Sequence, residues 1–547
     1  MKAFAALYQA LDRTTSSRKK IAAIAAYLDT VAPEEAAWAV YFLAGGKIKR
    51  LLPTAYLRAY VLRQTGLPHW LFEECYETVG DLAETIALLL PHSKTVRDTP
   101  LNEWVTEGLL PLQSLGEEGR ASELDRLLDG WDSDTRFICL KFITGGFRVG
   151  VSRLTVTRAL AQHTGLAVTQ MAQRMVGYLN NRQNPSATRY QALIADRDED
   201  LKAIEPGQPY PFFLAQPLGQ QTDALNALWA ESNRWQVEWK WDGIRAQIVC
   251  RHGEVWLWSR GEDLITEQFP ELSEMAQALP TGTVLDGEIL VWHEEQALPA
   301  SFASLQKRLG RKRLTEAFKR DYPVVFMVYD LLEHEGLDCR EEPLQIRRER
   351  LVNLCDTHPD SRLKLSPVMA VEDAGQARCE QAKAREARVE GLMIKALDSR
   401  YGVGRTRQAG LWFKYKLDPL TVDAVLIYAQ RGHGRRASLY TDYTLAVWDD
   451  ATPGAPRTLV PIAKAYSGLT DKEIKQIDGI LRKSTIESFG PVKRVEPTLV
   501  FELGFEGILP SPRHKSGVAL RFPRLLRWRI DKPVQEADSL VTLKALL

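Results

Sequence analysis

The middle of the chain contains the stretch Glu238-Trp239-Lys240-Trp241-Asp242-Gly243-Ile244-Arg245. Its alternation predicts a β-strand that places Glu238 and Lys240 on one face and Trp239 on the other. A lysine judged by its position alone is usually a solvated surface residue. The spacing Lys-x-Asp-Gly-x-Arg is short enough to arise by chance, so the rest of the chain decides what this stretch does.

The chain around this stretch divides into three regions that differ in their residue patterns. Residues 1–205 read as successive helices, and Phe4, Leu7, Tyr8 and Leu11 keep helical spacing in the first of them. A linker rich in proline opens a block of alternating strands and helices at residues 206–417. Residues 418–547 have short, turn-rich strands that suit a small β-barrel. The expected fold is therefore multidomain: an all-α domain (1–205), an α+β domain (206–417) and a β-barrel domain (418–547).

The overall charge balance conceals local clusters of basic residues. The 547 residues include 71 Lys and Arg and 70 Asp and Glu, and a net charge of +1 alone argues against a nucleic-acid partner. Residues 135–195, however, contain eight basic residues and no acidic one, and further basic clusters lie at residues 307–313 and 521–532. Each could be only a solvated face, but three of them favour a chain that wraps an anionic polymer. The candidates for phosphate contact include Arg148, Arg153, Lys307, Arg308 and Arg311.

Six further segments follow the lysine stretch, in the order Ser259-Arg260-Gly261, Leu285-Asp286-Gly287-Glu288, Phe326-Met327-Val328-Tyr329-Asp330, Glu390-Gly391-Leu392-Met393-Ile394-Lys395, Trp412-Phe413-Lys414-Tyr415-Lys416 and Arg524-Leu525-Leu526-Arg527-Trp528-Arg529-Ile530-Asp531-Lys532. This series resembles that of the covalent nucleotidyltransferases, and most closely that of the ATP-dependent DNA ligases. The resemblance spans the whole chain and implies a helical DNA-binding domain, a nucleotidyltransferase (adenylation) domain and an OB-fold domain. One departure is Gly261, where many members of that family have Asn.

The resemblance implies a role for each matching residue. Lys240 looks like the catalytic nucleophile that forms a lysyl-adenylate, with ATP and Mg²⁺ as cofactors. The other implied roles are adenine contact for Glu238 and Phe326, contact with AMP and the 5′-phosphate of a nick for Arg245 and Arg260, ribose or metal binding for Glu288 and Glu390, phosphate binding for Lys414 and above all Lys416, and orientation of the leaving pyrophosphate for Arg529, Asp531 and Lys532.

The residue types also suit this chemistry on their own. An amine attacks phosphorus only when it is neutral, and an unperturbed lysine, with a pKa of about 10.4, is almost wholly charged at pH 7. Nearby cations favour the neutral form of the lysine. The candidates are Arg245, Arg260, Lys414 and Lys416, together with a bound Mg²⁺ ion. Lys414 and Lys416 are two apart in a predicted strand and so share a face. Glu288 and Glu390 would supply the oxygen ligands that Mg²⁺ prefers.

The implied reaction has three steps. AMP passes from ATP to Lys240, then to the 5′-phosphate of a nick in double-stranded DNA, and the 3′-hydroxyl finally expels it in replication, repair or recombination. An RNA ligase or a GTP-dependent capping-type enzyme would share the lysine motif, and the acid-free helical front argues against both. A non-catalytic DNA clamp is a further alternative, against which the intact set of Lys240, Glu288, Glu390 and Lys416 weighs.

Several classes of protein are disfavoured by what the sequence lacks. The six cysteines are scattered without a Cys-x-x-Cys pair, which argues against a zinc ribbon and indicates a reducing compartment. No window approaches the roughly 18 apolar residues that a membrane span requires, and no secretory signal is evident. We therefore expect a cytoplasmic protein that does not bind membranes and encircles DNA as a monomer.

Overall fold

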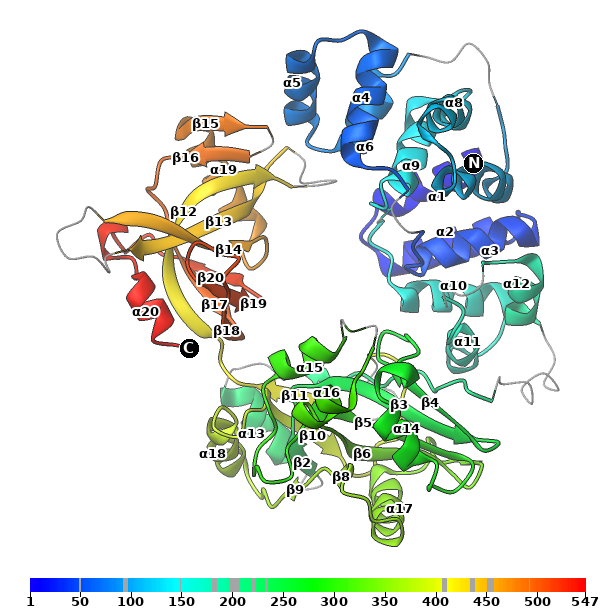
Figure 1. The fold of residues 1–547 in the computed structure, drawn as a ribbon, viewed down its shortest axis with the longest axis vertical. Coiled ribbons are helices and arrows are strands. Elements are labelled where there is room, and N and C mark those ends of the chain that lie inside the picture. The colour runs from blue at the N-terminus through cyan, green and yellow to red at the C-terminus, as the bar shows by residue number, and fades with distance from the viewer. Residues whose placement is uncertain are drawn as a thin grey trace. The chain divides into compact units, whose positions relative to one another are not determined.

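The computed structural model describes residues 1–48, 51–91, 97–147, 149–179, 184–195, 206–218, 222–231, 235–309, 311, 313–405, 411–432, 438–449, 457–490 and 492–547 (Figure 1). They form two compact units. One contains Met1–Thr15, Lys47–Gly150 and Pro419–Leu547, and the other contains Ser16–Gly46 and Val151–Asp418. The helical first part of the chain contributes to both units, and the domain boundaries expected at residues 205 and 417 stay predictions.

The first part of the chain is helical, as expected. Its main helices are α1 (Lys2–Asp12), α2 (Ser17–Leu28), α3 (Pro33–Leu43), α4 (Thr54–Thr65), α5 (His69–Val79), α6 (Leu82–Leu89), α8 (Glu117–Leu128), α9 (Ser133–Ile143), α10 (Arg153–Thr164), α11 (Val168–Met175) and α12 (Ala187–Ile194). Side chains of Ser16, Asp81 and Ser152 cap helices by accepting from a backbone N–H three residues on. Among the described residues, the first strand is β1 (Gln216–Pro217).

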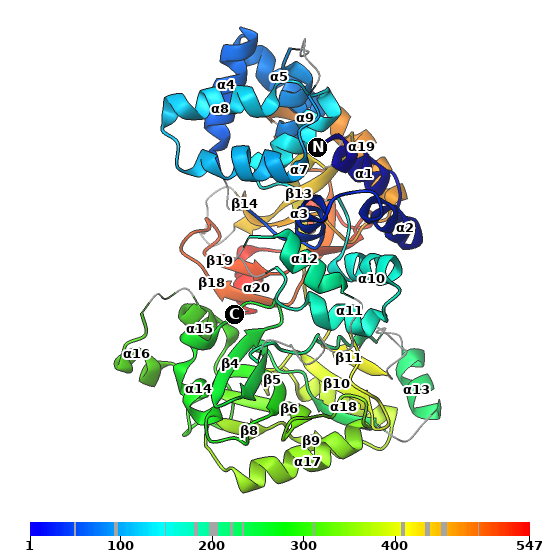
Figure 2. The same ribbon diagram turned by 90° about the vertical axis from the view of Figure 1, so that its right-hand side faces the viewer.

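The middle of the chain contains two sheets. One has the order β4-β3-β5-β6-β7, with β8 paired to β6, and the other has the order β1-β11-β10-β2-β9. The strands are β2 (Trp235–Trp239), β3 (Ile244–Arg251), β4 (Glu254–Ser259), β5 (Thr283–Val291), β6 (Val324–His334), β7 (Leu337–Asp338), β8 (Leu363–Leu365), β9 (Val368–Met369), β10 (Gly391–Ala396) and β11 (Trp412–Lys416). Helix α17 (Leu344–Thr357) packs on β6 and β8 (Figure 2). Strands therefore alternate with helices, as the α+β prediction requires.

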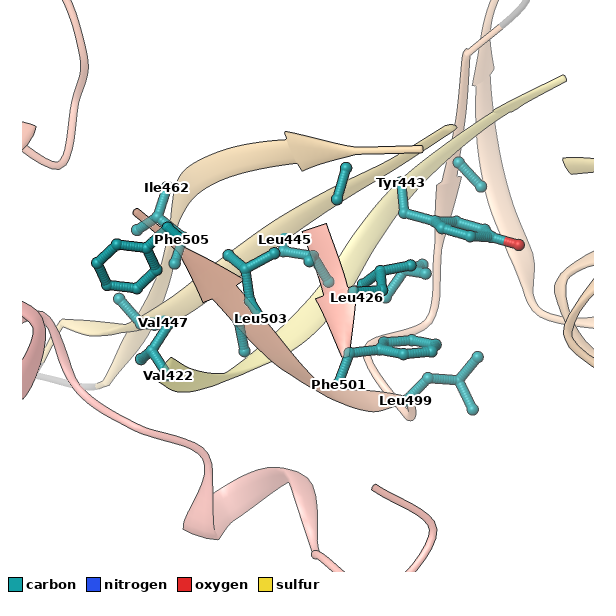
Figure 3. Packing of buried hydrophobic residues seen from close by; sticks show 14 of the residues in the cluster. Val422, Leu426, Tyr443, Leu445, Val447, Ile462, Leu499, Phe501, Leu503 and Phe505 are labelled. Carbon is teal, nitrogen blue, oxygen red and sulfur yellow. The ribbon is translucent and has the colours of Figure 1, made fainter. Parts of the chain in front are cut away.

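The last part of the chain is a curled sheet. Its strands are β12 (Leu420–Arg431), β13 (Tyr440–Asp449), β14 (Thr458–Ala465), β15 (Thr485–Phe489), β16 (Val492–Val495), β17 (Val500–Phe505) and β20 (Arg524–Trp528). Alternate residues such as Leu426, Leu445 and Phe501 point into a common core (Figure 3). Helix α19 (Asp471–Lys483) starts with a capping box between Thr470 and Glu473. β12 and β13 are longer than expected, because register irregularities let them bend around this core.

Among the described residues, no helix combines the length and the apolar character that crossing a bilayer requires.

Candidate active site

Lys240 follows directly after β2 and is fixed by main-chain hydrogen bonds. Its N–H donates to the carbonyl oxygen of Gly391 at 2.8 Å, and its carbonyl oxygen accepts from the N–H of Glu390 at 2.8 Å. The Lys240 Nζ forms an ion pair with the Glu390 carboxylate, and Lys416 Nζ lies 3.2 Å from Glu390 Oε2. Burial raises the pKa of Glu390, but the charges and hydrogen bonds of Lys240 and Lys416 outweigh it and lower that pKa to about 2.

The two lysines of β11 lie beside this pair. Lys414 is paired across the sheet with Met393, and Lys416 with Gly391, so both lysines lie on one face of β11. Burial, together with the positive charges of Lys416, Arg405 and Lys240, lowers the pKa of Lys414. The structure thus brings the predicted nucleophile and both predicted phosphate-binding lysines together.

Glu288 enters the site from the other sheet. It is paired with Arg245 across β3 and β5, and it is partly exposed. Burial raises the pKa of Glu288 to about 8, and the negative charge of Glu390 contributes, while Lys240 and Arg245 act against the rise. Two carboxylates that repel each other in this way fit a cation such as Mg²⁺, which takes one or two carboxylates and completes its shell with water and phosphate oxygens. In the described part of the chain, no group of three or more His, Cys, Asp or Glu could hold a metal by itself.

Arg245 is held by protein groups. Its guanidinium contacts Asp286 twice, at 3.1 Å and 2.7 Å, and donates to the carbonyl oxygen of Phe213 at 2.7 Å. Asp286 is fully buried and also accepts from the hydroxyl of Tyr401 at 2.6 Å. The Arg245–Asp286 pair therefore fastens β3 to β5 at the site, and contact between Arg245 and AMP stays a prediction.

Glu238 lies on the same sheet face as Lys240 and is almost fully buried. Its Oε1 accepts from Gln236 Nε2 at 2.6 Å and from Lys395 Nζ at 2.8 Å. Lys395 lies over the ring of Tyr329, with 4.6 Å between Nζ and the ring centroid, so the two sheets meet here. Adenine contact by Glu238 stays a prediction, and the aromatic ring that lies close to this residue through Lys395 is that of Tyr329.

The prediction of adenine contact by Phe326 is wrong. The Phe326 side chain is fully buried in the core, directly under Gly287, where it presents no face to a ligand. The pairing of β5 with β6 skips one residue, because Gly287 is paired with Val328 and Asp286 with Asp330. Tyr329 is the extra residue of this bulge, and it lies on the side of Arg245 and Lys395.

Arg260 lies in an exposed turn after β4. The turn is closed by a hydrogen bond from the N–H of Glu262 to the carbonyl oxygen of Ser259 at 2.8 Å, and Glu262 adopts a left-handed φ of 63°. The Glu262 carboxylate contacts Arg153 at 2.5 Å and accepts from the N–H of Gly177 at 3.1 Å. A cavity of about 580 Å³ adjoins this turn, lined by Gly177, Ser259, Gly261, Glu262 and Gln268 among others.

The C-terminal trio lies in the other unit and forms its own cluster. Asp423 Oδ2 accepts from Arg529 at 2.8 Å and from Lys532 at 2.7 Å, and Arg529 also pairs with Asp531 at 2.8 Å. The hydrogen bond from Arg529 lowers the pKa of Asp531 to about 2. Lys240 belongs to the other unit, so a role of this trio toward pyrophosphate stays a prediction.

The predicted DNA-contacting residues have different outcomes. Arg148 lies outside the described residues. Arg308 is fully buried, pairs with Glu271 and donates to the carbonyl oxygen of Tyr322 at 2.9 Å, so its prediction as a phosphate contact is wrong. Arg153 is engaged with Glu262 and the carbonyl oxygen of Met175. Lys307 and Arg311 are exposed.

Several arginines of residues 135–195 serve the fold. Arg136 donates to the carbonyl oxygens of Leu90 and Leu128, and Arg174 to that of Leu193 at 3.1 Å, all at or next to the C-terminal ends of helices. Cations satisfy the unpaired carbonyls and favour the negative end of the helix dipole there. The acid-free segment is therefore less of a free basic surface than its composition indicates.

Sequence reasoning missed four residues that the structure brings to the site, namely Tyr329, Lys395, Tyr401 and Glu262. Tyr329 and Lys395 lie in two segments of the motif series, in which Phe326 and Glu390 are the predicted site residues instead. An aromatic ring and a lysine in predicted strands are both signals that could have identified them. Tyr401 and Glu262 lie in loops, where no periodicity predicts the direction of a side chain.

Comparison with known proteins identifies the family of the chain. Three family models match, "ATP dependent DNA ligase domain" at residues 213–416, "DNA ligase N terminus" at residues 1–161 and "ATP dependent DNA ligase C terminal region" at residues 436–532. The chain is similar to a probable DNA ligase of Koribacter versatilis, with 34% identity over 99% of this chain and 95% of the relative. It is also similar to a DNA ligase of Thermococcus fumicolans, with 28% identity over 99% of this chain and 97% of the relative.

One solved structure shares the fold along most of the chain. The structure titled "Pmar-Lig_PreS3" aligns with a TM-score of 0.61 and 15% identity over 96% of this chain and 99% of its own. Together with the matches in sequence, this likeness covers the helical, adenylation and C-terminal β-rich parts alike. The chain belongs to the ATP-dependent DNA ligase family.

Proposed function

We propose that this DNA ligase joins the 3′-hydroxyl and 5′-phosphate ends of a nick in duplex DNA, with Lys240 as the nucleophile. The observation that carries the proposal is the juxtaposition of Lys240, Glu390 and Lys416, with Lys414 on the same face. A cluster of three lysines around one carboxylate suits a site that receives phosphates, because their positive charge offsets the charge of a triphosphate.

The first step links AMP to the enzyme. Lys240 Nζ loses a proton to solvent and attacks the α-phosphorus of ATP, a P–N bond forms, and the P–O bond to pyrophosphate breaks. Lys416 and Lys414 contact the phosphates. Catalysis of this kind depends on positioning and on neutralising charge, and it needs no separate acid–base triad.

The second and third steps move AMP through the DNA. An oxygen of the 5′-phosphate attacks the phosphorus of lysyl-AMP, so that a phosphoanhydride forms, the P–N bond breaks and Lys240 Nζ takes up a proton from solvent. The 3′-hydroxyl then attacks the 5′-phosphate, loses its proton and expels AMP. The exposed guanidinium of Arg260, on the turn after β4, is our candidate for holding the 5′-phosphate.

Base recognition uses Glu238 and Tyr329. Glu238 Oε1 is engaged by Gln236 and Lys395, which leaves Oε2 to accept from an amino group of adenine. The Tyr329 ring, which contacts the same Lys395 that binds Glu238, is our candidate for the flat surface that packs on the base. This assignment replaces Phe326 with the aromatic residue that faces the site.

Glu288 and Glu390 would hold Mg²⁺. When bound, the ion neutralises phosphate charge near the α-phosphorus. Glu288 must lose its proton to bind the ion, so metal binding and the pH of the medium are linked at this residue.

DNA contact involves residues outside the nucleotide site. Lys307 and Arg311 are exposed and can neutralise backbone phosphates, and Arg148 is a further candidate from its sequence context. Arg529, Asp531 and Lys532 would orient pyrophosphate, and the chain would act as a monomer around the duplex.

One experiment tests the nucleophile and the nucleotide together. The protein is incubated with α-labelled ATP or GTP and Mg²⁺, and label that survives denaturation is measured. We expect label from ATP, its loss in Lys240→Ala and its retention in Lys383→Ala, because Lys383 lies at the end of α18 (Ala374–Lys383) and pairs with Glu380 on the same helix. Label from GTP, or label that survives Lys240→Ala, would overturn the mechanism. Sealing of nicked DNA but not of nicked RNA then identifies the substrate.

A further inference from the structure

Lys395 is a buried cation that the reaction does not use directly. It lies on β10 with 1% of its surface exposed, in the middle of the five-stranded sheet. Burying an ammonium group is costly unless it is paired, and the carboxylate that pairs with it is that of Glu238, at 2.8 Å. Its Nζ also lies over the rings of Tyr329 and Trp412, at 4.6 Å and 4.7 Å from their centroids.

The hydrogen bonds to Glu238 are unevenly divided between its two oxygens. Gln236 Nε2 at 2.6 Å and Lys395 Nζ at 2.8 Å both donate to Oε1. Within the described ranges, both donors that contact this carboxylate bond to Oε1, and no donor reaches Oε2. The carboxylate is thus fixed by one oxygen and offers the other.

We infer that Lys395 is a positioning residue that holds Glu238 Oε2 toward the nucleotide base, and so makes the site select a 6-amino purine over a 6-oxo purine. The inference rests on the proposed contact between Glu238 and adenine. An ionised carboxylate can only accept hydrogen bonds. The 6-amino group of adenine donates to it, whereas the 6-oxo group of hypoxanthine or guanine faces it with a second acceptor.

The neighbouring strands leave the carboxylate little freedom. Gln236 and Lys395 are directly paired across β2 and β10, and Glu238 is paired with Met393, so the three polar side chains share one sheet face. Without Lys395, the Glu238 carboxylate would lose the cation that offsets its burial, and it could rotate away from the base. A site built to hydrogen-bond its ligand discriminates strongly, because the wrong ligand leaves buried polar groups unpaired.

The test compares ATP with inosine triphosphate, which has a 6-oxo group, in single-turnover self-adenylylation. We expect the wild type to prefer ATP, and Lys395→Met to reduce the ratio of the two second-order rate constants of labelling at least tenfold, chiefly through the apparent Kd for ATP. Lys395→Gln keeps a donor for Oε1 and should retain most of the preference. Glu238→Gln combined with Lys395→Met should lose no more preference than Glu238→Gln alone, because the two residues act as one unit.

Arg308→Met is the matched control, since it also removes the cation of a buried ion pair, away from the nucleotide. It should leave the ratio unchanged. An unchanged ratio in Lys395→Met, including an equal loss of labelling from both nucleotides, would overturn the positioning role while the nucleophile stands. A wild type that takes label from neither nucleotide would overturn both the inference and the proposed function.

Discussion

Lys240 and Glu390, 150 residues apart in the chain, are joined twice, by a main-chain hydrogen bond and by a side-chain ion pair. The main-chain contact holds the backbone of Glu390 next to that of Lys240, and the side-chain ion pair brings the carboxylate to the Lys240 amine. The same carboxylate lies 3.2 Å from Lys416 Nζ, so Glu390 lies between the amines of Lys240 and Lys416 and contacts both. The distance between the amines of Lys240 and Lys416 is therefore set by Glu390.

Replacing Glu390 by Gln should slow self-adenylylation about 100-fold, since an ångström of misplacement at a reacting centre can cost that much. The amide cannot attract both ammonium groups, and the two lysines would repel each other. Rapid-quench measurement of label from α-labelled ATP gives the rate. Glu380→Gln is the control, because Glu380 pairs with Lys383 on the same helix. A Glu390→Gln enzyme with the wild-type rate would refute the spacing role.

Glu288 should make the stability of the free enzyme fall as pH rises. Burial raises its pKa from an ordinary 4.5 to about 8. Between these two values the folded state binds more protons than the unfolded state, so the free energy of unfolding decreases with increasing pH. Below pH 4.5 the group is protonated in both states, and above pH 8 the loss is complete.

Thermal melting between pH 5 and 9 checks this expectation, with Glu288→Gln as the comparison. The variant carries no titrating group, so its melting temperature should exceed that of the wild type increasingly toward pH 8. Mg²⁺ binds the ionised carboxylate and should stabilise the wild type most at high pH. If the two melting curves run parallel across the range, the raised pKa is wrong.

Much of the fold and of the site could be predicted because the signals are local. Helix α1 covers Lys2–Asp12, where the spacing of Phe4, Leu7, Tyr8 and Leu11 predicts a helix, and all four side chains are buried. Strand alternation placed Lys414 and Lys416 on one face, as observed. These outcomes depend on the periodicity of single elements, which the sequence contains directly.

The rest depended on interactions between elements. Phe326 and Tyr329 are three residues apart in β6, so alternation places their side chains on opposite faces, but which of the two faces lies toward the site depends on the pairing of β6 with β5. Likewise, Arg136 and Arg174 look like free cations in the sequence. Each donates to a carbonyl oxygen near the C-terminal end of another helix, and the sequence does not show that these carbonyls lack a partner within their own helix. Tertiary hydrogen bonds, and not charge patterns, decide these positions.

Lys307 and Arg308 are adjacent but should respond in opposite ways to substitution by Ala. Arg308 is fully buried, so its loss leaves the Glu271 carboxylate uncompensated and should cost about 3–5 kcal/mol of unfolding free energy. Lys307 is exposed, and its loss should change stability by no more than about 0.5 kcal/mol. As a phosphate contact it should lower the salt slope of DNA binding by about one. Urea unfolding and binding titrations at several salt concentrations measure both effects.

The reverse outcome would be informative for each residue. A stable Arg308→Ala with weakened DNA binding would mean that this arginine leaves its pocket to meet the phosphates. An unchanged salt slope in Lys307→Ala would remove it from the DNA-contacting surface.

The contact between Arg153 and Glu262 should couple α10 to the turn that carries Arg260. The pair lies at 2.5 Å with both side chains partly buried, and Glu262 adopts a left-handed φ of 63° that other L-residues rarely adopt. Glu262→Ala should slow the sealing of pre-adenylylated nicks about tenfold, because the turn then loses its anchor, and should leave self-adenylylation near the wild-type rate. Glu262→Gln keeps a hydrogen-bond acceptor for Gly177 and should lose less.

A double-mutant cycle with Arg153→Ala separates this coupling from the two individual losses. The two variants share one contact, so their effects on stability should be non-additive by about 0.5–1 kcal/mol. The sealing rate of the double variant should equal that of Glu262→Ala alone, since the anchor is already absent. Additive losses in sealing, or a fall in self-adenylylation to match, would show that the two residues act separately or that the turn also serves the first step.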